Sequence, residues 1–220
     1  MPRETAHPTI RAIRLFIASP GDVADERRAV RRMIGALNLS LEAYGWRVEL
    51  HGWEDRGPTG GRPQADINAD VERCDLFLGI LWRRWGTPTG DSRSGFAEEW
   101  ELAQGRFART GHPDLWLYFK DVGTDAVEDE QLAEVRAFRQ RVEESEVAFY
   151  KTFADLAEFE NRVRQKILGA IFERTELTRA DIGVLAVDWP SVYREDRPAL
   201  TVSRRAASIA LPSPRALSST

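Results

Sequence analysis

Three glutamates, Glu98, Glu99 and Glu101, stand close together in the segment 96–109. The apolar residues of this segment recur at helical spacing and are Phe96, Trp100, Ala103 and Phe107. With about 100° of rotation per residue, Glu99 lies roughly 70° from the centre of this stripe and Glu98 roughly 170° away. We therefore expect Glu99 to border the core and Glu98 to face solvent. A carboxylate at that boundary can be aimed at a bound sugar or cationic ring, or it can merely complement the helix dipole.

A second group of polar residues follows the short apolar run 13–18. Ser19 ends that run, and Asp22 has the residue type and position of a helix N-cap. Glu26 falls on the apolar side of the helix that follows, and Arg27 flanks it. Glu26 and Arg27 can bind a ligand or form a structural pair, and Ser19 and Asp22 belong to the same candidate binding region.

Two tryptophans follow another apolar run, 76–81. Trp82 and Trp85 surround two arginines in a loop that extends to Gly95. An aromatic ring here could stack on a base while an arginine meets phosphate. Packing against neighbouring helices explains the tryptophans equally well. The three histidines are far apart and predict neither a metal cluster nor a catalytic triad.

Alternating strands and helices are predicted around these residues. The expected strands are 13–18, 46–51, 76–81, 115–119 and 147–150, and the main expected helices are 22–44, 67–74, 96–109, 129–144 and 156–171. This order predicts an α/β fold: a three-layer sandwich with a five-stranded parallel sheet ordered 2-1-3-4-5 and helices on both faces. Such a sheet binds ligands beyond the carboxyl ends of its first and third strands. The glutamates and tryptophans above converge there.

Composition narrows the class of protein. The net charge of −4 argues against direct nucleic-acid binding over the whole surface. A single cysteine, Cys74, excludes an intrachain disulfide framework and reads as a small buried hydrophobe. No apolar run approaches the roughly 20 residues of a membrane helix, so we expect a cytoplasmic protein. The P-loop pattern is missing, so we expect no P-loop ATPase. We expect neither a metal nor a cofactor.

Domain boundaries follow from where the pattern begins and weakens. We expect an N-terminal extension over 1–10, one α/β domain over 11–175 and a C-terminal linker or tail over 176–220. Within the domain, residues 53–63 carry three glycines and two prolines, which predicts an exposed loop.

Three sequence blocks together resemble a known family. They are Ile-Arg-Leu-Phe-Ile-Ala-Ser-Pro-Gly-Asp from residue 13, Cys-Asp-Leu-Phe-Leu-Gly-Ile-Leu-Trp-Arg-Arg-Trp-Gly from residue 74 and Ser-Gly-Phe-Ala-Glu-Glu-Trp-Glu-Leu-Ala from residue 94. The chain resembles an uncharacterised TIR-related family found at the N-terminus of NACHT and other STAND-type NTPases. The resemblance covers roughly residues 11–172, although the Ala-Ser-Pro-Gly-Asp turn departs from the Ser-Tyr of many TIR domains.

The resemblance implies a flavodoxin-like, TIR-like fold, a function and a key residue. In catalytic TIR domains a helix glutamate after the third strand assists cleavage of the nicotinamide glycosidic bond of NAD, and Glu99 matches that position. The loop 53–63 then looks like the glycine-containing loop of TIR domains, which makes Gly60 and Gly61 candidate self-association residues. A downstream NTPase or sensor domain is the implied partner.

Three functions remain open. The first is an NAD glycohydrolase effector that consumes NAD or a related nucleotide on assembly, in antiphage defence or immune signalling. The second is a non-catalytic TIR-like interaction module that drives self-association. The third is a sensor that binds a nucleotide signal without cleaving it. Glu99 favours catalysis, and the unusual turn after the first strand favours the interaction module.

Overall fold

The computed structural model describes residues 10–52, 64–87, 94–124 and 126–174. The strands are β1 (Arg11–Ala18), β2 (Trp46–His51), β3 (Leu76–Leu81), β4 (Asp114–Lys120) and β5 (Phe149–Phe153). The helices are α1 (Ala24–Leu41), α2 (Gln64–Val71), α3 (Gly95–Thr110), α4 (Glu130–Ser145) and α5 (Leu156–Glu173), with short 3-10 turns η1 (Gly21–Val23) and η2 (Glu42–Tyr44).

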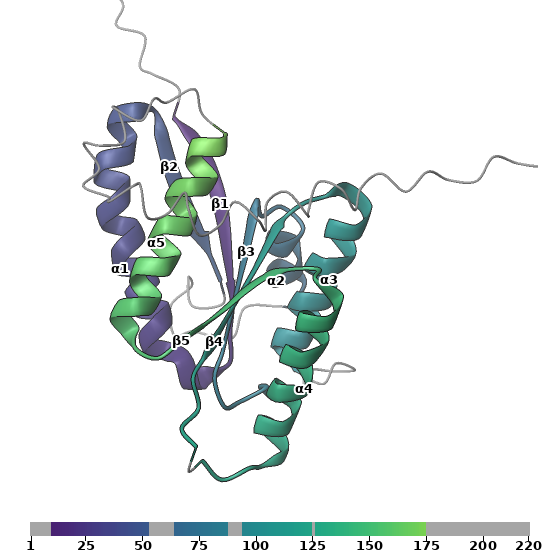
Figure 1. The fold of residues 1–220 in the computed structure, drawn as a ribbon. Helices are drawn as coiled ribbons and strands as arrows, with labels where there is room; N and C mark the ends of the chain where they lie inside the picture. Colours follow the sequence, from purple (N-terminus) through teal and green to yellow (C-terminus); the bar gives the residue numbers. More distant parts are fainter. Residues whose placement is uncertain (1–9, 53–63, 88–93, 125, 175–220) are drawn as a thin grey trace, which may run out of the picture. The chain divides into compact units, whose positions relative to one another are not determined.

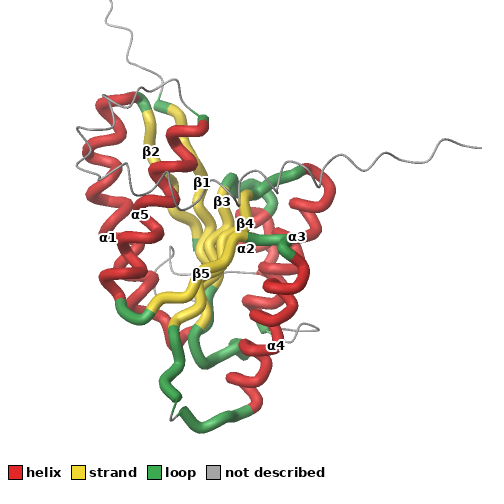
Figure 2. Tube along the Cα trace, in the orientation of Figure 1, coloured by secondary structure: helices red, strands yellow, loops and turns green. Residues whose placement is uncertain are grey.

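The five strands form one parallel sheet in the order β2-β1-β3-β4-β5, which confirms the predicted flavodoxin-like topology. Helices α1 and α5 cover one face, and α2, α3 and α4 cover the other (Figures 1 and 2). Every strand therefore ends at the same edge of the sheet, and each helix starts from that carboxyl edge. The order reverses between β1 and β3, as predicted.

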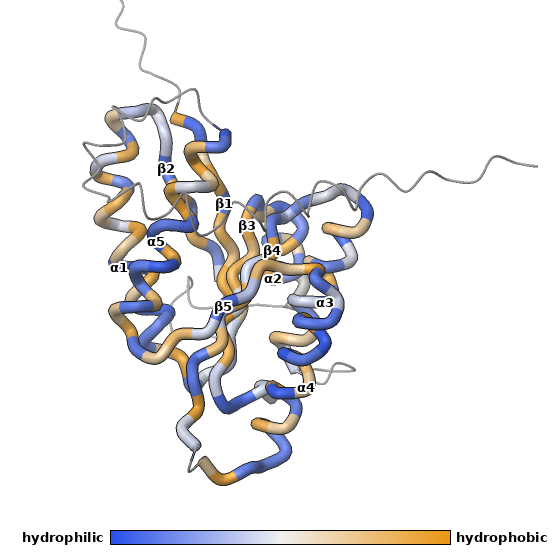
Figure 3. The backbone as a smooth tube through the Cα atoms, viewed as in Figure 1, coloured by the Kyte–Doolittle hydropathy of each residue, from blue (hydrophilic) through white to orange (hydrophobic). Residues whose placement is uncertain are grey.

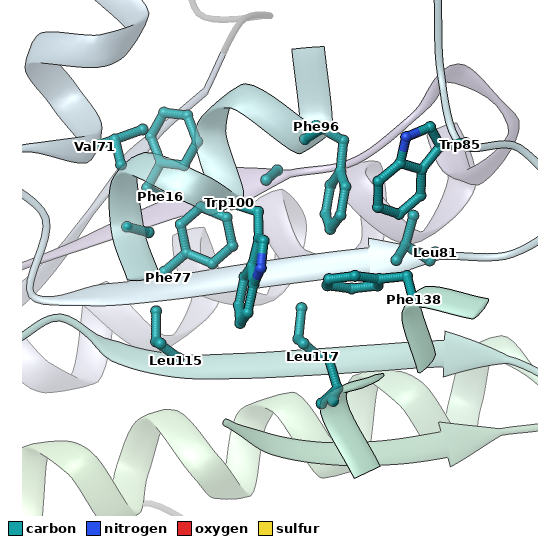
Figure 4. Packing of buried hydrophobic residues seen from close by; sticks show 14 of the residues in the cluster. Phe16, Val71, Phe77, Leu81, Trp85, Phe96, Trp100, Leu115, Leu117 and Phe138 are labelled. Carbon is teal, nitrogen blue, oxygen red and sulfur yellow. The ribbon is translucent and has the colours of Figure 1, made fainter. Parts of the chain in front are cut away.

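The sheet lies between two layers of helices because its strands are hydrophobic. All six residues of β3 are buried, as a strand covered on both faces requires. In Figure 3 the central strands are mostly hydrophobic, whereas the helices alternate between hydrophobic and hydrophilic stretches. Figure 4 shows the core under α3 and α4, where Trp85, Phe96, Trp100 and Phe138 pack ring against ring.

The structure differs from the predictions at several points. The helix predicted over 67–74 is α2 at Gln64–Val71, three residues earlier. The last strand is β5 at Phe149–Phe153, two to three residues later than predicted, and α4 before it ends at Ser145, one residue later, with the left-handed Glu146 as its C-cap. Asp22 is not a helix N-cap: it lies inside η1, and its side chain caps neither η1 nor α1. Glu98 does not face solvent but is half-buried, because Asn68 of α2 donates a hydrogen bond to its Oε1 at 3.0 Å.

β2 is an edge strand of the sheet, and a side chain of α1 pairs with the backbone groups of one of its residues. The amide of Asn38 in α1 donates to the Val48 carbonyl at 2.9 Å and accepts from the Val48 N–H at 2.8 Å. A strand edge with unpaired backbone groups invites pairing with another chain, so Asn38 protects this edge at its middle. A groove of about 470 Å³ lies between α1 and β2, with Arg31, Gly35, Asn38 and Arg47 among its lining residues.

Candidate active site

A buried ion pair crosses the carboxyl edge of the sheet. Glu26 of α1 is only 2% exposed, and its Oε1 lies 2.8 Å from the Nζ of Lys120, the last residue of β4. The same ammonium group lies 4.5 Å from the ring centroid of Trp82, in the loop after β3. Lys120 therefore joins β4, the β3 loop and α1 above the point where the strand order reverses.

The neighbouring Arg27 is also buried and holds the turn after β1. Its Nη1 donates to the Ser19 Oγ at 2.8 Å and to the Pro20 carbonyl at 2.6 Å. Arg27 thus fixes the Ser19-Pro20-Gly21 turn from inside the helix that follows it. The sequence placed Glu26 and Arg27 correctly on the protected side of this helix, where both make structural contacts.

Two side-chain oxygens fix the loop after β3. Asp22 Oδ2 accepts hydrogen bonds from the backbone N–H groups of Arg83 and Arg84, both at 3.0 Å. Gln131 Oε1, from the first turn of α4, accepts from the N–H groups of Trp85 and Gly86 at 2.9 and 3.0 Å. Gly86 has a φ of 108°, a backbone conformation that favours glycine. The loop is therefore attached to η1 on one side and to α4 on the other.

Some hydrogen-bonding capacity at this loop is unused. Among the described residues, three buried atoms of this region have no hydrogen-bond partner: Asp22 Oδ1, Trp82 Nε1 and Trp85 Nε1. Leaving a buried polar group unsatisfied costs about 1–3 kcal/mol. Such groups need an explanation in a native fold, and three of them on one loop and its anchor make that loop a candidate site.

Glu99 occupies the second turn of α3 and is only 8% exposed. Burial, with a smaller contribution from the charge of Glu98, raises the pKa of Glu99 from 4.5 to about 8. The helix begins at Ser94, a buried residue whose Oγ accepts from the Ala97 N–H at 3.1 Å. A protected carboxyl group with a strongly raised pKa, close to the carboxyl edge of a parallel sheet, has the properties of a functional acid.

The approach of α3 to the sheet depends on a glycine. A Cβ on Gly79 of β3 would lie 2.5 Å from Leu117 Cδ2 and 3.2 Å from Phe96 Cε2. Gly79 therefore lets the first turn of α3 pack directly on the strand beneath it.

A comparison with protein families identifies the chain. The family model described as "Domain of unknown function (DUF4062)" matches residues 14–168, which is more than half of the sequence. The chain belongs to the DUF4062 family. No curated protein sequence matches it. The matched range spans β1 to most of α5, so it includes every described residue of the candidate site.

The DUF4062 domain brings some of the predicted site residues together. Asp22, Glu26, Trp82 and Lys120 form one connected set, called the carboxyl-edge network below. Arg27 and Ser19 pair beside it, whereas Trp85 packs into the core against Phe96 and Phe138. No hydrogen bond or ion pair within the described residues links Glu99 to this network. Gly60 and Gly61 lie outside the described residues.

Sequence reasoning missed Lys120 and Gln131. Lys120 carried a usable signal, because it is one of only three lysines in the chain and directly follows a buried strand at the ligand-binding edge. Gln131 carried none, since a glutamine in a first helical turn is ordinary. Its role appears only when the β3 loop is placed beside α4.

The DUF4062 domain shows no metal site among its described residues, where no group of three or more potential ligands gathers. His51 Nδ1 lies 3.3 Å from Asp70 Oδ2, which links β2 to α2.

Cys74 is fully buried, and burial raises the pKa of its thiol to about 12, which fits its predicted role as a small apolar residue. No helix among the described residues is long and apolar enough to span a membrane.

Proposed function

We propose that this DUF4062 domain is a TIR-like effector that hydrolyses NAD or a related nucleotide at its N-glycosidic bond when copies assemble. The observation that carries the proposal is Glu99, a carboxyl group sheltered from water in the second turn of α3. The resemblance of the three sequence blocks to the TIR-related domains of NACHT and STAND proteins supports the same residue.

Cleavage of the ribose–nicotinamide bond requires little from the protein beyond one negative charge beside the ribose. The bond between the ribose C1′ and the nicotinamide nitrogen breaks, and its electron pair leaves with the nicotinamide. Water then adds its oxygen to C1′ and releases a proton. Positive charge develops on the ribose in the transition state, and an ionised Glu99 would stabilise it.

The raised pKa of Glu99 is compatible with this role. The carboxyl group is mostly protonated at pH 7, because burial disfavours its charged form. A cationic nicotinamide ring nearby would favour the carboxylate again, since an opposite charge within a few ångströms lowers the pKa of an acid. The substrate would therefore ionise the group that acts on it.

Nicotinamide release at high protein concentration, or on a clustering support, tests the proposal. We expect release by the wild type, none by Glu99→Gln and near wild-type release by Glu98→Gln. The Glu98→Gln control removes a charge one residue away, and glutamine can still accept the hydrogen bond from Asn68. Equal activity of wild type and Glu99→Gln would refute the role of Glu99.

A second candidate, the non-catalytic interaction module, is favoured by one observation. Glu26 and Lys120 of the carboxyl-edge network pair with each other, Asp22 binds backbone amides of the β3 loop, and Arg27 is engaged by the turn after β1. If this function is correct, substitution of Gly60 and Gly61 should abolish oligomers, and Glu99→Gln should leave cellular function intact. Nucleotide binding without cleavage by a folded, clustered protein would instead identify a sensor.

A further inference from the structure

Four successive backbone amides in the β3 loop point at side-chain oxygens. The N–H groups of Arg83 and Arg84 converge on one oxygen of Asp22, and those of Trp85 and Gly86 converge on one oxygen of Gln131. Consecutive amides that converge in this way form a concave donor surface, which in other proteins binds anions such as phosphate. Here the protein's own oxygens occupy it.

One of the two occupants is itself an anion. The Asp22 carboxylate oxygen sits where a phosphate oxygen would receive the same two N–H groups. We infer that the loop Trp82 to Gly86 is a binding site for a phosphate or pyrophosphate group, with the Asp22 carboxylate as its resident occupant. A ligand enters by displacing Asp22, while Gln131 keeps its end of the loop in place.

Incomplete hydrogen bonding in the resting state supports this inference independently. Trp85 is 6% exposed, and its indole N–H has no partner among the described residues. Trp82 Nε1 and the second Asp22 oxygen are also buried and unpartnered. Asp22 offers the amides a single oxygen, whereas a phosphate group has several acceptors in a tetrahedral arrangement. A rearranged loop around phosphate could therefore satisfy more of its donors than the resting one does.

The charges around the loop favour an incoming anion. Arg83 and Arg84 bring two guanidinium groups on the loop itself, and guanidinium groups bind phosphate oxygens well. The Lys120 ammonium lies over the ring of Trp82, where its charge is shared with Glu26. The site does not include Glu99, so it holds or fails independently of the proposed hydrolysis.

Amide NMR of the full chain tests the inference. Inorganic pyrophosphate, ADP and adenosine are titrated into wild type, Asp22→Ala and Asp25→Ala, and the signals of residues 83–86 are followed. Removing the resident carboxylate should tighten pyrophosphate binding about tenfold or more, the usual value of a charge-assisted hydrogen bond. Asp25→Ala is the matched control, because it removes an equal charge from an exposed residue three positions away.

The outcomes separate the alternatives. Tighter binding of pyrophosphate and ADP, but not adenosine, by Asp22→Ala supports a phosphate site, and tighter binding of ADP than of pyrophosphate identifies a nucleotide as the source. Equal binding by Asp22→Ala and Asp25→Ala, or shifts confined to other residues, overturns the inference. If Asp22→Ala does not fold, Asp22→Asn keeps an acceptor oxygen without the charge, and affinity no higher than wild type in that variant is equally decisive.

Discussion

Replacing Glu99 with glutamine should stabilise the domain, and increasingly so as the pH rises. The folded state raises the pKa of Glu99 from its ordinary 4.5 to about 8, so the folded protein binds this proton more tightly than the unfolded chain does. Stability from this group is complete below about pH 4.5 and is lost progressively as the pH rises towards about 8. Glutamine keeps the shape of the side chain and removes the titration.

The magnitude follows from the same pKa. Since one pKa unit is worth about 1.4 kcal/mol, the wild type should lose about 3 kcal/mol relative to Glu99→Gln between pH 5 and pH 8. For a domain of this size, that difference corresponds to roughly 6–12 °C in Tm. Chemical denaturation of both proteins at several pH values measures it, and the comparison cancels titrations that the two proteins share.

The control and the refuting result are equally specific. Glu98→Gln is the matched control: it keeps the buried Glu99, so it should lose stability between pH 5 and pH 8 nearly as the wild type does. A difference between wild type and Glu99→Gln that stays within 0.5 kcal/mol from pH 5 to pH 8, about the size of an ordinary surface substitution, would refute the reasoning. It would mean that Glu99 is hydrated and ionised at its ordinary pKa.

Three further predictions follow from the structure. Lys120→Met should cost about 3 kcal/mol in denaturation experiments, because it leaves Glu26 as an unpaired buried charge, and adding Glu26→Gln should recover most of the loss. Gly79→Ala should destabilise the domain by about 1–3 kcal/mol, because its new Cβ would clash with Leu117. Gly35→Ala should stabilise α1 by about 0.5–1 kcal/mol, because no atom lies within 4 Å of the new Cβ. Thermal unfolding of both variants tests this. If hydrolysis uses the Glu99 carboxylate, kcat/KM should rise with pH up to about 8 and then level off, and a fall across that range would assign the protonated acid instead.

The fold could be predicted because its signals are local. The apolar run of β3 matches the observed strand residue for residue, and Gly45, with a φ of 73°, ends the first helical segment as expected. The stripe of α3 predicted that Glu99 borders the core, and the residue is buried there, since helical geometry fixes which residues share a face. Alternating elements then leave few topologies, because parallel crossovers are right-handed.

The site was harder to predict because its contacts join residues that are distant in sequence. Asp22 has the residue type and position of an N-cap, yet its carboxylate binds amides 61 and 62 residues away. An aspartate accepts hydrogen bonds from any suitably placed N–H group, so its sequence position cannot tell a cap from a long-range anchor. The same limit applies to Glu98, whose exposure depended on where α2 packs.

The two parts of the candidate site differ in how strongly the fold determines them. Glu99 belongs to α3, a helix whose first turn packs closely on Gly79 of the sheet, so its backbone position follows from the core. The β3 loop is held by two side chains, Asp22 and Gln131, that offer one oxygen each to pairs of amides. Rigid elements suit a carboxylate that must be held in place, and a loop with few anchors suits a ligand that must displace one of them. If phosphate binds at the loop and hydrolysis takes place beside α3, the two sites are connected by Trp85 of that loop, which packs against Phe96 in the first turn of the same helix.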